Sequence, residues 1–260
     1  MNADRYLGRI GVDPDAVGSP DRETLARLQG AHVRSVPFET LAITGDPYSD
    51  RGGEGVSLAL PTLYEKIVAN RRGGFCFELN GLFGWLLSEL DYDVQRAAAQ
   101  VLGDDGDPGV PANHLVSLVT IEDRYVVDVG LGVPKLRRPL ALDGTVVEDA
   151  AGIAWRAVDS DRPDADYRIE ARREDDWSGR YILDTTPRDR SYFEATCEYY
   201  ATAPESHFTG DPVVTLATSD GHLKLSPGEL VRQGPDGRET TPVDAGTWPD
   251  VLAREFGLRL

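Results

Sequence analysis

Over the first ninety residues, apolar side chains recur at spacings of three and four, the period of an α-helix. Ser19 and Pro20 predict one helix start, because serine caps helices and proline suits the first turn. Pro61 predicts a second helix. Residues 75–90 carry a broad apolar stripe, which is typical of a buried helix. Residues 45–55, rich in Gly and Asp, are expected to form a surface loop.

From about residue 93 the pattern changes to short apolar runs separated by turn residues, which predicts strands. Residues 104–109 form a predicted loop, whereas residues 137–166 have no clear period. A connecting helix is expected over 191–203, and a final helix near Thr247. The predicted strands are 94–102, 115–121, 125–129, 181–185, 213–217 and 222–225. Helices first and strands later indicate an α+β protein.

Composition narrows the class of protein. The chain has 260 residues, 40% of them hydrophobic, and no apolar run long enough to span a membrane. Its start lacks a signal sequence, so we expect a cytoplasmic protein with no membrane partner. Two cysteines are too few for a disulfide framework, and no Cys or His pair has metal-ligand spacing. We therefore expect no metal.

The charge is strongly acidic, with a net value of −17, and this disfavours nucleic acid as a partner. The chain has 28 Asp and 16 Glu, but only three Lys against 24 Arg. An acidic chain with so little lysine resembles the proteins of salt-loving archaea, in which concentrated salt screens self-repulsion. We expect a halophilic protein, with an ordinary acidic enzyme as the alternative.

Cys76 is the first candidate for chemistry. It lies between the Gly73-Gly74 turn and the apolar helix. Unpaired N–H groups at a helix start carry partial positive charge, which is expected to lower the pKa of a thiol there. His114 and Asp128 each interrupt a strand-like run and can complete a Cys-His-Asp triad. Taken singly, a buried cysteine, a core histidine and a turn-forming aspartate remain open interpretations.

Residues 72–83 (RGGFCFELNGLF) resemble the signature of the arylamine N-acetyltransferases. Shorter matches follow the order of that family at 36–39, 113–114, 127–130 and 203–208. The resemblance implies that the cysteine takes acetyl from acetyl-CoA and passes it to an arylamine or hydrazine through an acetyl-cysteine, with ping-pong kinetics. Acetyl-CoA would be the co-substrate.

The resemblance also implies an α+β fold of three subdomains with a cysteine-protease-like triad. A helical bundle over 1–91 would carry the cysteine, and a strand-rich, barrel-like domain over 92–190 would carry His114 and Asp128. A connecting helix over 191–204 would lead to a C-terminal α/β lid over 205–260. The triad would then form across a domain interface, where clefts are common.

Further site residues follow from matching positions. Arg72, Glu78 and Asn80 are expected to support the site, with a surface salt bridge as the alternative for the first two. Phe38, Phe75, Leu131 and Phe208 are expected to bind substrate. Leu131 stands where many relatives carry Phe, and Cys197 stands where they commonly carry Asn. The first difference can change the preferred acceptor.

Three other functions remain open at this stage. The same triad serves amide synthases, which release or cyclise a carrier-bound acyl chain, and thiol hydrolases, in which water discharges the acyl-enzyme. A binding module with a buried, unreactive cysteine is the third. CoA is itself a polyanion, so an acidic enzyme needs salt or local cations to admit it, and Arg71, Arg72 and Lys224 are the candidates.

Overall fold

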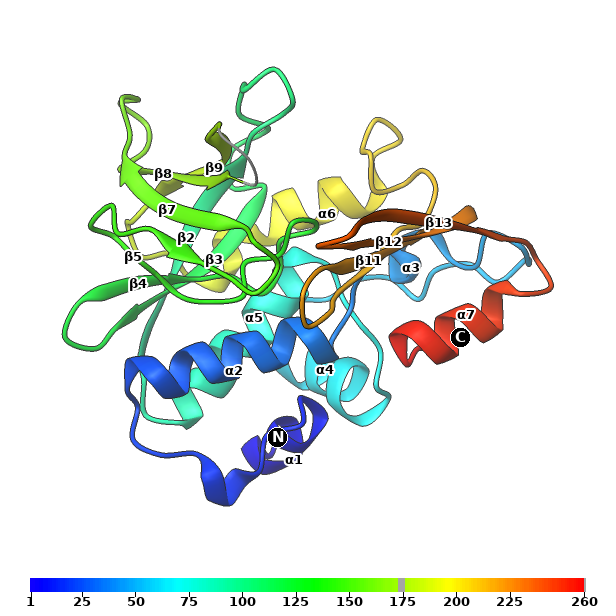
Figure 1. Cartoon of the computed structure of the whole chain (residues 1–260), viewed down its shortest axis with the longest axis horizontal. Helices are drawn as coiled ribbons and strands as arrows, with labels where there is room; N and C mark the ends of the chain where they lie inside the picture. Colours follow the sequence, from blue (N-terminus) through cyan, green and yellow to red (C-terminus); the bar gives the residue numbers. More distant parts are fainter. Residues whose placement is uncertain (173–175, 260) are drawn as a thin grey trace.

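The computed structural model describes residues 1–172 and 176–259. Figure 1 shows an α+β fold in which helices from the N-terminal third lie below a curved sheet, with a second sheet beside them. This arrangement confirms the predicted fold class. The division at residues 91, 190 and 204 stays a prediction. The helices are α1 (Ala3–Arg9), α2 (Arg22–Ser35), α3 (Leu41–Thr44), α4 (Leu60–Tyr64), α5 (Cys76–Glu89), α6 (Glu194–Thr202) and α7 (Trp248–Phe256).

Two helix starts show how local chemistry sets the boundaries. Helix α2 begins at Arg22, later than Ser19 predicted, because Asp21 is the capping residue and accepts a hydrogen bond from the Thr24 N–H at 2.8 Å. Helix α4 does have proline in its first turn, as predicted, and continues as a π-helical turn, η2 (Glu65–Ala69).

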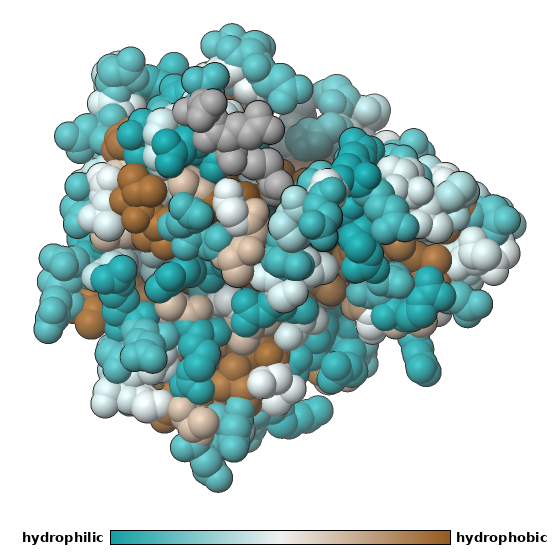
Figure 2. Space-filling model, viewed as in Figure 1, coloured by the Kyte–Doolittle hydropathy of each residue, from teal (hydrophilic) through white to brown (hydrophobic). Residues whose placement is uncertain are grey.

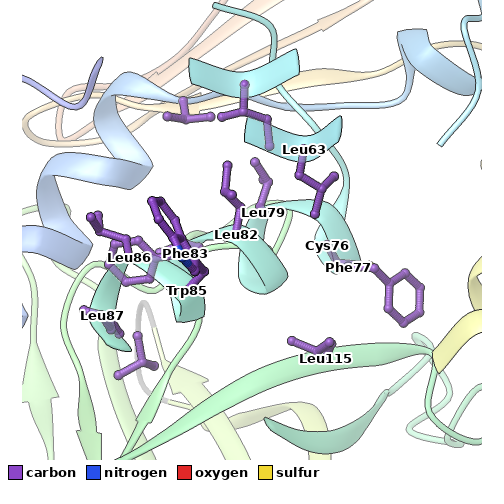
Figure 3. Packing of buried hydrophobic residues seen from close by; sticks show 14 of the residues in the cluster. Leu63, Cys76, Phe77, Leu79, Leu82, Phe83, Trp85, Leu86, Leu87 and Leu115 are labelled. Carbon is purple, nitrogen blue, oxygen red and sulfur yellow. The ribbon is translucent and has the colours of Figure 1, made fainter. Parts of the chain in front are cut away.

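Helix α5 lies at the centre of the molecule. It packs against α1 and α4 on one side and against β2 (Asp93–Val101) and β3 (His114–Thr120) on the other. Figure 3 shows Leu79, Leu82 and Phe83 along this helix, with Leu115 of β3 facing it and Cys76 at its start. Burial on nearly all sides agrees with the broad apolar stripe and fixes the cysteine at the edge of a packed core.

Among the described residues, the larger sheet has eight antiparallel strands in the order β5-β4-β3-β2-β9-β8-β7-β6. Contact between β5 and β7 shows how far it curls toward a barrel. The predicted strands at 94–102, 115–121, 125–129 and 181–185 are confirmed as β2, β3, β4 and β9, whereas β5 to β8 were not assigned from the pattern. The remaining bounds are β4 (Arg124–Val127), β5 (Leu140–Ala141), β6 (Val147–Glu148), β7 (Ala154–Asp159), β8 (Tyr167–Arg172) and β9 (Ser178–Asp184).

The smaller sheet has the order β1-β10-β11-β12-β13. Its edge strand β1 (Phe38–Glu39) comes from the N-terminal third, and Phe38 pairs with Thr215. One face packs on α7 through Trp248 and neighbouring apolar residues, and the register places Phe38, Thr215 and Lys224 in one row on the other face. The C-terminal strands are β10 (Val214–Ala217), β11 (His222–Ser226), β12 (Gly228–Gly234) and β13 (Gly237–Val243).

Hydrophilic residues cover most of the face shown in Figure 2, with hydrophobic residues in small separate areas. This distribution fits the acidic composition. Within residues 1–172 and 176–259, none of the helices combines the length and the apolar character needed to cross a membrane.

Candidate active site

A cavity of about 770 Å³ lies where the start of α5, the larger sheet and the smaller sheet meet. Cys76 and His114 both line it, and Asp128 lies behind His114, fully buried. The structure therefore brings the three predicted triad residues together from the start of α5, the start of β3 and the loop after β4. Only a small part of the Cys76 and His114 side chains is exposed to solvent.

Cys76 is the first residue of α5, so its side chain lies beside the unpaired N–H groups of the helix start. Its sulfur lies 3.9 Å from the backbone oxygen of Asn113. The Phe77 N–H at the helix start does lower the pKa of this thiol, but the net shift is upward, opposite to the expectation. Burial raises the pKa of Cys76, and the nearby charges of Asp128 and Glu78 add to the effect, outweighing the Phe77 N–H. A thiolate here needs a cationic partner.

His114 and Asp128 form a close hydrogen-bonded pair, with 2.7 Å between Nε2 and Oδ2. His114 is the first residue of β3, where the strand leaves the cavity, and the ring of Tyr181 lies 5.5 Å from its own ring. Because Asp128 engages Nε2, the other ring nitrogen, Nδ1, is left for the cavity side. The pair thus fixes the orientation of the imidazole.

The Asp128 carboxylate forms hydrogen bonds with the side chains of His114 and Asn80 and with two backbone N–H groups of its own loop. Its Oδ1 accepts hydrogen bonds from Asn80 Nδ2 at 2.9 Å and from the N–H groups of Gly130 and Leu131 at 2.9 and 3.1 Å. Burial alone would raise the pKa of this carboxyl group, but His114, Asn80 and Gly130 together hold it below its ordinary value. Asp128 is therefore a carboxylate that can stabilise a charged imidazole.

Asn80 connects the cysteine helix to both other triad elements. Its Nδ2 also donates to the Leu115 carbonyl at 2.6 Å, and its Oδ1 accepts from the Val129 N–H at 2.8 Å. Every polar atom of this buried amide side chain contacts the strand of His114 or the loop of Asp128. Asn80, predicted to support the site, thus contacts the triad residue Asp128 directly.

Arg72 and Glu78 are both buried, so the surface salt bridge considered for them does not describe the structure. They do not pair with each other. Arg72 contacts Glu39 at 3.3 Å and Glu54 at 2.8 Å, whereas Glu78 binds Lys66 at 2.7 Å and accepts from the Phe75 N–H at 3.2 Å. These contacts tie the start of α5 to η2 and to β1. The pattern alone gave no signal for Lys66.

The predicted substrate-contact residues divide into two groups. Phe38, Leu131 and Phe208 line the cavity. Phe75 is completely buried and contacts the ring of Phe208 with 6.0 Å between ring centroids, so it supports the wall and does not line the cavity. Phe75, which caps α5, faces the core, and the sequence match could not distinguish a core position from a cavity position.

Other residues at the site were missed. Asn113 lines the cavity, accepts from the Val101 N–H at 2.8 Å and contacts the Tyr200 hydroxyl at 3.4 Å. Lys135 is buried and contacts the Leu131 carbonyl. The one feature of the sequence that distinguished Lys135 is that the chain has only three lysines.

Of the three cations considered for CoA, Lys224 lines the cavity. Arg71 is exposed elsewhere, and Arg72 already has two carboxylate partners. The exposed loop of Asp104, Asp105 and Asp107 also lines the cavity, so an anionic ligand meets charges of both signs there. Within the described ranges, no group of three or more His, Cys, Asp or Glu side chains is placed to hold a metal ion.

Gly130 allows the loop of Asp128 to approach the cysteine helix closely. A Cβ atom there would lie 2.8 Å from the Cys76 Cα and 2.6 Å from Asn80 Nδ2, closer than packing permits. Gly130→Ala is therefore expected to separate the two segments, lowering the free energy of unfolding by about 1–3 kcal/mol. It should also slow alkylation of Cys76 by iodoacetamide. Urea unfolding and intact-mass measurement of the alkylated protein check both effects.

Gly132→Ala is the matched control, because a Cβ atom at Gly132 would have no neighbour within 4 Å. This change should leave the free energy of unfolding within about 0.5 kcal/mol of the wild type. Equal destabilisation by the two substitutions would show that the contact between Gly130 and the start of α5 is not a constraint.

Known proteins are similar to this chain in both sequence and fold. Residues 21–260 match the N-acetyltransferase family model. The arylamine N-acetyltransferase of Mycolicibacterium smegmatis is 32% identical over 100% of this chain and 93% of its own. That of Mycobacterium marinum, solved in complex with CoA, is 30% identical with a TM-score of 0.85, covering 98% of this chain and 92% of its own.

A Bacillus cereus arylamine N-acetyltransferase, described as having a Cys-His-Glu catalytic triad, shares the fold with a TM-score of 0.89 at 23% identity, with full coverage of both chains. The conserved architecture, the sequence match over the whole chain and the Cys76-His114-Asp128 geometry lead to one conclusion. The chain belongs to the arylamine N-acetyltransferase family.

Proposed function

We propose that this enzyme transfers acetyl from acetyl-CoA to arylamines or hydrazines by a ping-pong mechanism through an acetyl-Cys76 intermediate. The observation that carries the proposal is the pairing of His114 with a buried, multiply hydrogen-bonded Asp128 on the same cavity as Cys76. The relatives named for arylamine substrates, and the relative solved with CoA, support the choice of donor and acceptor.

In the first half-reaction, the Cys76 thiol passes its proton to His114. Burial opposes a lone thiolate, so the thiolate forms only as an ion pair with the imidazolium, which the carboxylate of Asp128 stabilises. The thiolate attacks the thioester carbonyl of acetyl-CoA. In this proposal, N–H groups at the start of α5, beside Cys76, stabilise the developing oxyanion, after which CoA leaves with the proton from His114.

In the second half-reaction, the acceptor amine attacks the acetyl-thioester of Cys76, and His114 removes the proton from the amine. The thiol is regenerated when the tetrahedral intermediate collapses. Phe38, Leu131 and Phe208 provide an apolar wall for a flat acceptor. Because Leu131 lacks an aromatic ring, stacking from that side is absent, which favours smaller or less planar acceptors.

Intact-protein mass spectrometry tests the covalent intermediate. Mixing with acetyl-CoA should add one acetyl group to the wild type and none to Cys76→Ala. An aromatic amine or a hydrazine should discharge it within the time of one turnover, and water should do so far more slowly. Discharge by water alone would support a thiol hydrolase. A folded protein that takes no acetyl would direct the search to the carrier-bound acyl donors of amide synthases.

We also propose a cytoplasmic enzyme adapted to concentrated salt. Both cysteines are free, as expected in a reducing compartment, and the net charge is −17. CoA must approach a cavity bordered by Asp104, Asp105 and Asp107, and salt screens that repulsion to within a few ångströms at about 1 M.

The affinity for acetyl-CoA should therefore improve several-fold as NaCl rises from about 0.1 M to about 2 M. Changing Asp104, Asp105 and Asp107 together to Asn should improve the affinity at low salt and flatten the salt dependence. Asp13→Asn with Asp15→Asn, in a 3₁₀ turn that does not line the cavity, is the control. Binding measured by calorimetry that is unchanged or weaker in salt would contradict this account.

A further inference from the structure

Lys135 is a buried cation beside the cavity that the proposed mechanism does not use. Its side chain is 1% exposed, and Nζ donates to the Leu131 carbonyl oxygen at 3.2 Å. The same ammonium lies 5.7 Å from the centroid of the Phe38 ring, within the range of a cation–π interaction. It forms no ion pair with any carboxylate of residues 1–172 and 176–259.

Both of its contacts are walls of the active-site cavity. Leu131 follows the triad aspartate in the loop after β4, whereas Phe38 belongs to β1 at the edge of the smaller sheet. Lys135 thus joins two segments that are nearly a hundred residues apart in the sequence. A neutral side chain would keep neither the charged hydrogen bond nor the cation–π contact.

We propose that Lys135 is a positioning residue for the acceptor, whose ammonium holds the Leu131 loop and the Phe38 ring together as opposite walls of the acceptor pocket. Binding of the acceptor then depends on the positive charge of Lys135, whereas acetylation of Cys76 does not. This inference rests on the proposed function, and it assigns specificity to a residue outside the triad.

The surroundings of Lys135 make that charge sensitive to pH. Burial lowers the pKa of Lys135 to about 7; Asp128 opposes the change and Arg137 adds to it. His32 of α2 also faces it, and burial, together with the charges of Arg9 and Lys135, holds the pKa of that histidine well below its ordinary value. His32 therefore stays neutral. Lys135 is charged below pH 7 and loses its charge as the pH rises through this value.

Lys135→Met removes the charge while retaining an unbranched chain. A buried cation without a counterion contributes little to stability, so this variant should fold. It should raise the acceptor KM about tenfold and leave the rate of acetyl-enzyme formation within about twofold of the wild type. Equal losses in the two half-reactions would overturn the proposal.

The pH dependence separates positioning from a structural role. The ratio of wild-type to Lys135→Met acceptor kcat/KM should fall from about tenfold at pH 6 toward one at pH 8.5, because the wild type loses its charge. Because Asp128 is coupled to Lys135, the same ratio is measured for acetyl-enzyme formation, where it should stay constant with pH if the effect of Lys135 is confined to the acceptor. Leu136→Met, a conservative change at the adjacent buried residue, should give a constant ratio. A constant ratio for Lys135→Met would overturn the proposal.

A double-mutant cycle tests the route through Phe38. If Lys135 acts through that ring, Lys135→Met should raise the acceptor KM much less in a Phe38→Leu background than in the wild type. Fully additive effects would overturn this part of the inference and leave the Leu131 contact to account for any change in KM.

A direct titration needs no substitution at Lys135. The chain has three lysines, so protein labelled with ¹³C at lysine Cε gives three signals; Lys224→Arg and Lys66→Arg identify two of them and leave that of Lys135. Aniline without acetyl-CoA should raise the pKa of Lys135 by about one pH unit, since coupling is reciprocal. No change would overturn the inference. If the wild type formed no acetyl-enzyme, the proposed function would fail while this titration still decided the role of Lys135.

Discussion

The hydrogen bonds that converge on the Asp128 carboxylate are the constraint on which the site depends. His114 reaches it from β3, Asn80 from the cysteine helix, and two N–H groups from its own loop. A buried carboxylate is stable only with this many donors, so none of the three elements can move independently. The same contacts keep it charged, which the imidazolium requires.

In the proposed mechanism, this constraint is what allows a buried cysteine to react. Burial raises the pKa of Cys76, so the proposed thiolate depends on an ion pair with His114 and not on the helix start alone. Gly130 permits the close approach of loop and helix, and the ion pairs of Glu78 and Arg72 fix the helix start to neighbouring elements. Catalytic geometry and core packing are therefore parts of one arrangement.

The sequence predicted those features that local patterns determine. Helical spacing identified α5, and the resemblance identified Cys76, His114, Asp128 and Asn80. Strands β7 and β8 were missed because Arg156 and Arg168 interrupt their apolar runs. Strand β1 was missed because a strand of two residues is too short to show an alternating pattern. The partners of Glu78, Lys135 and Cys76 arise from long-range packing, so neither the Lys66 ion pair nor the direction of the Cys76 pKa follows from spacing.

In the proposed mechanism, Asn80, Asp128 and His114 act as one unit in activating Cys76. A double-mutant cycle on the rate of acetyl-enzyme formation, with Asn80→Ala, Asp128→Asn and the combined variant, tests this most directly. We expect strong non-additivity, with the double variant no slower than Asp128→Asn to within about threefold. Independent, multiplicative losses in a folded protein would contradict it.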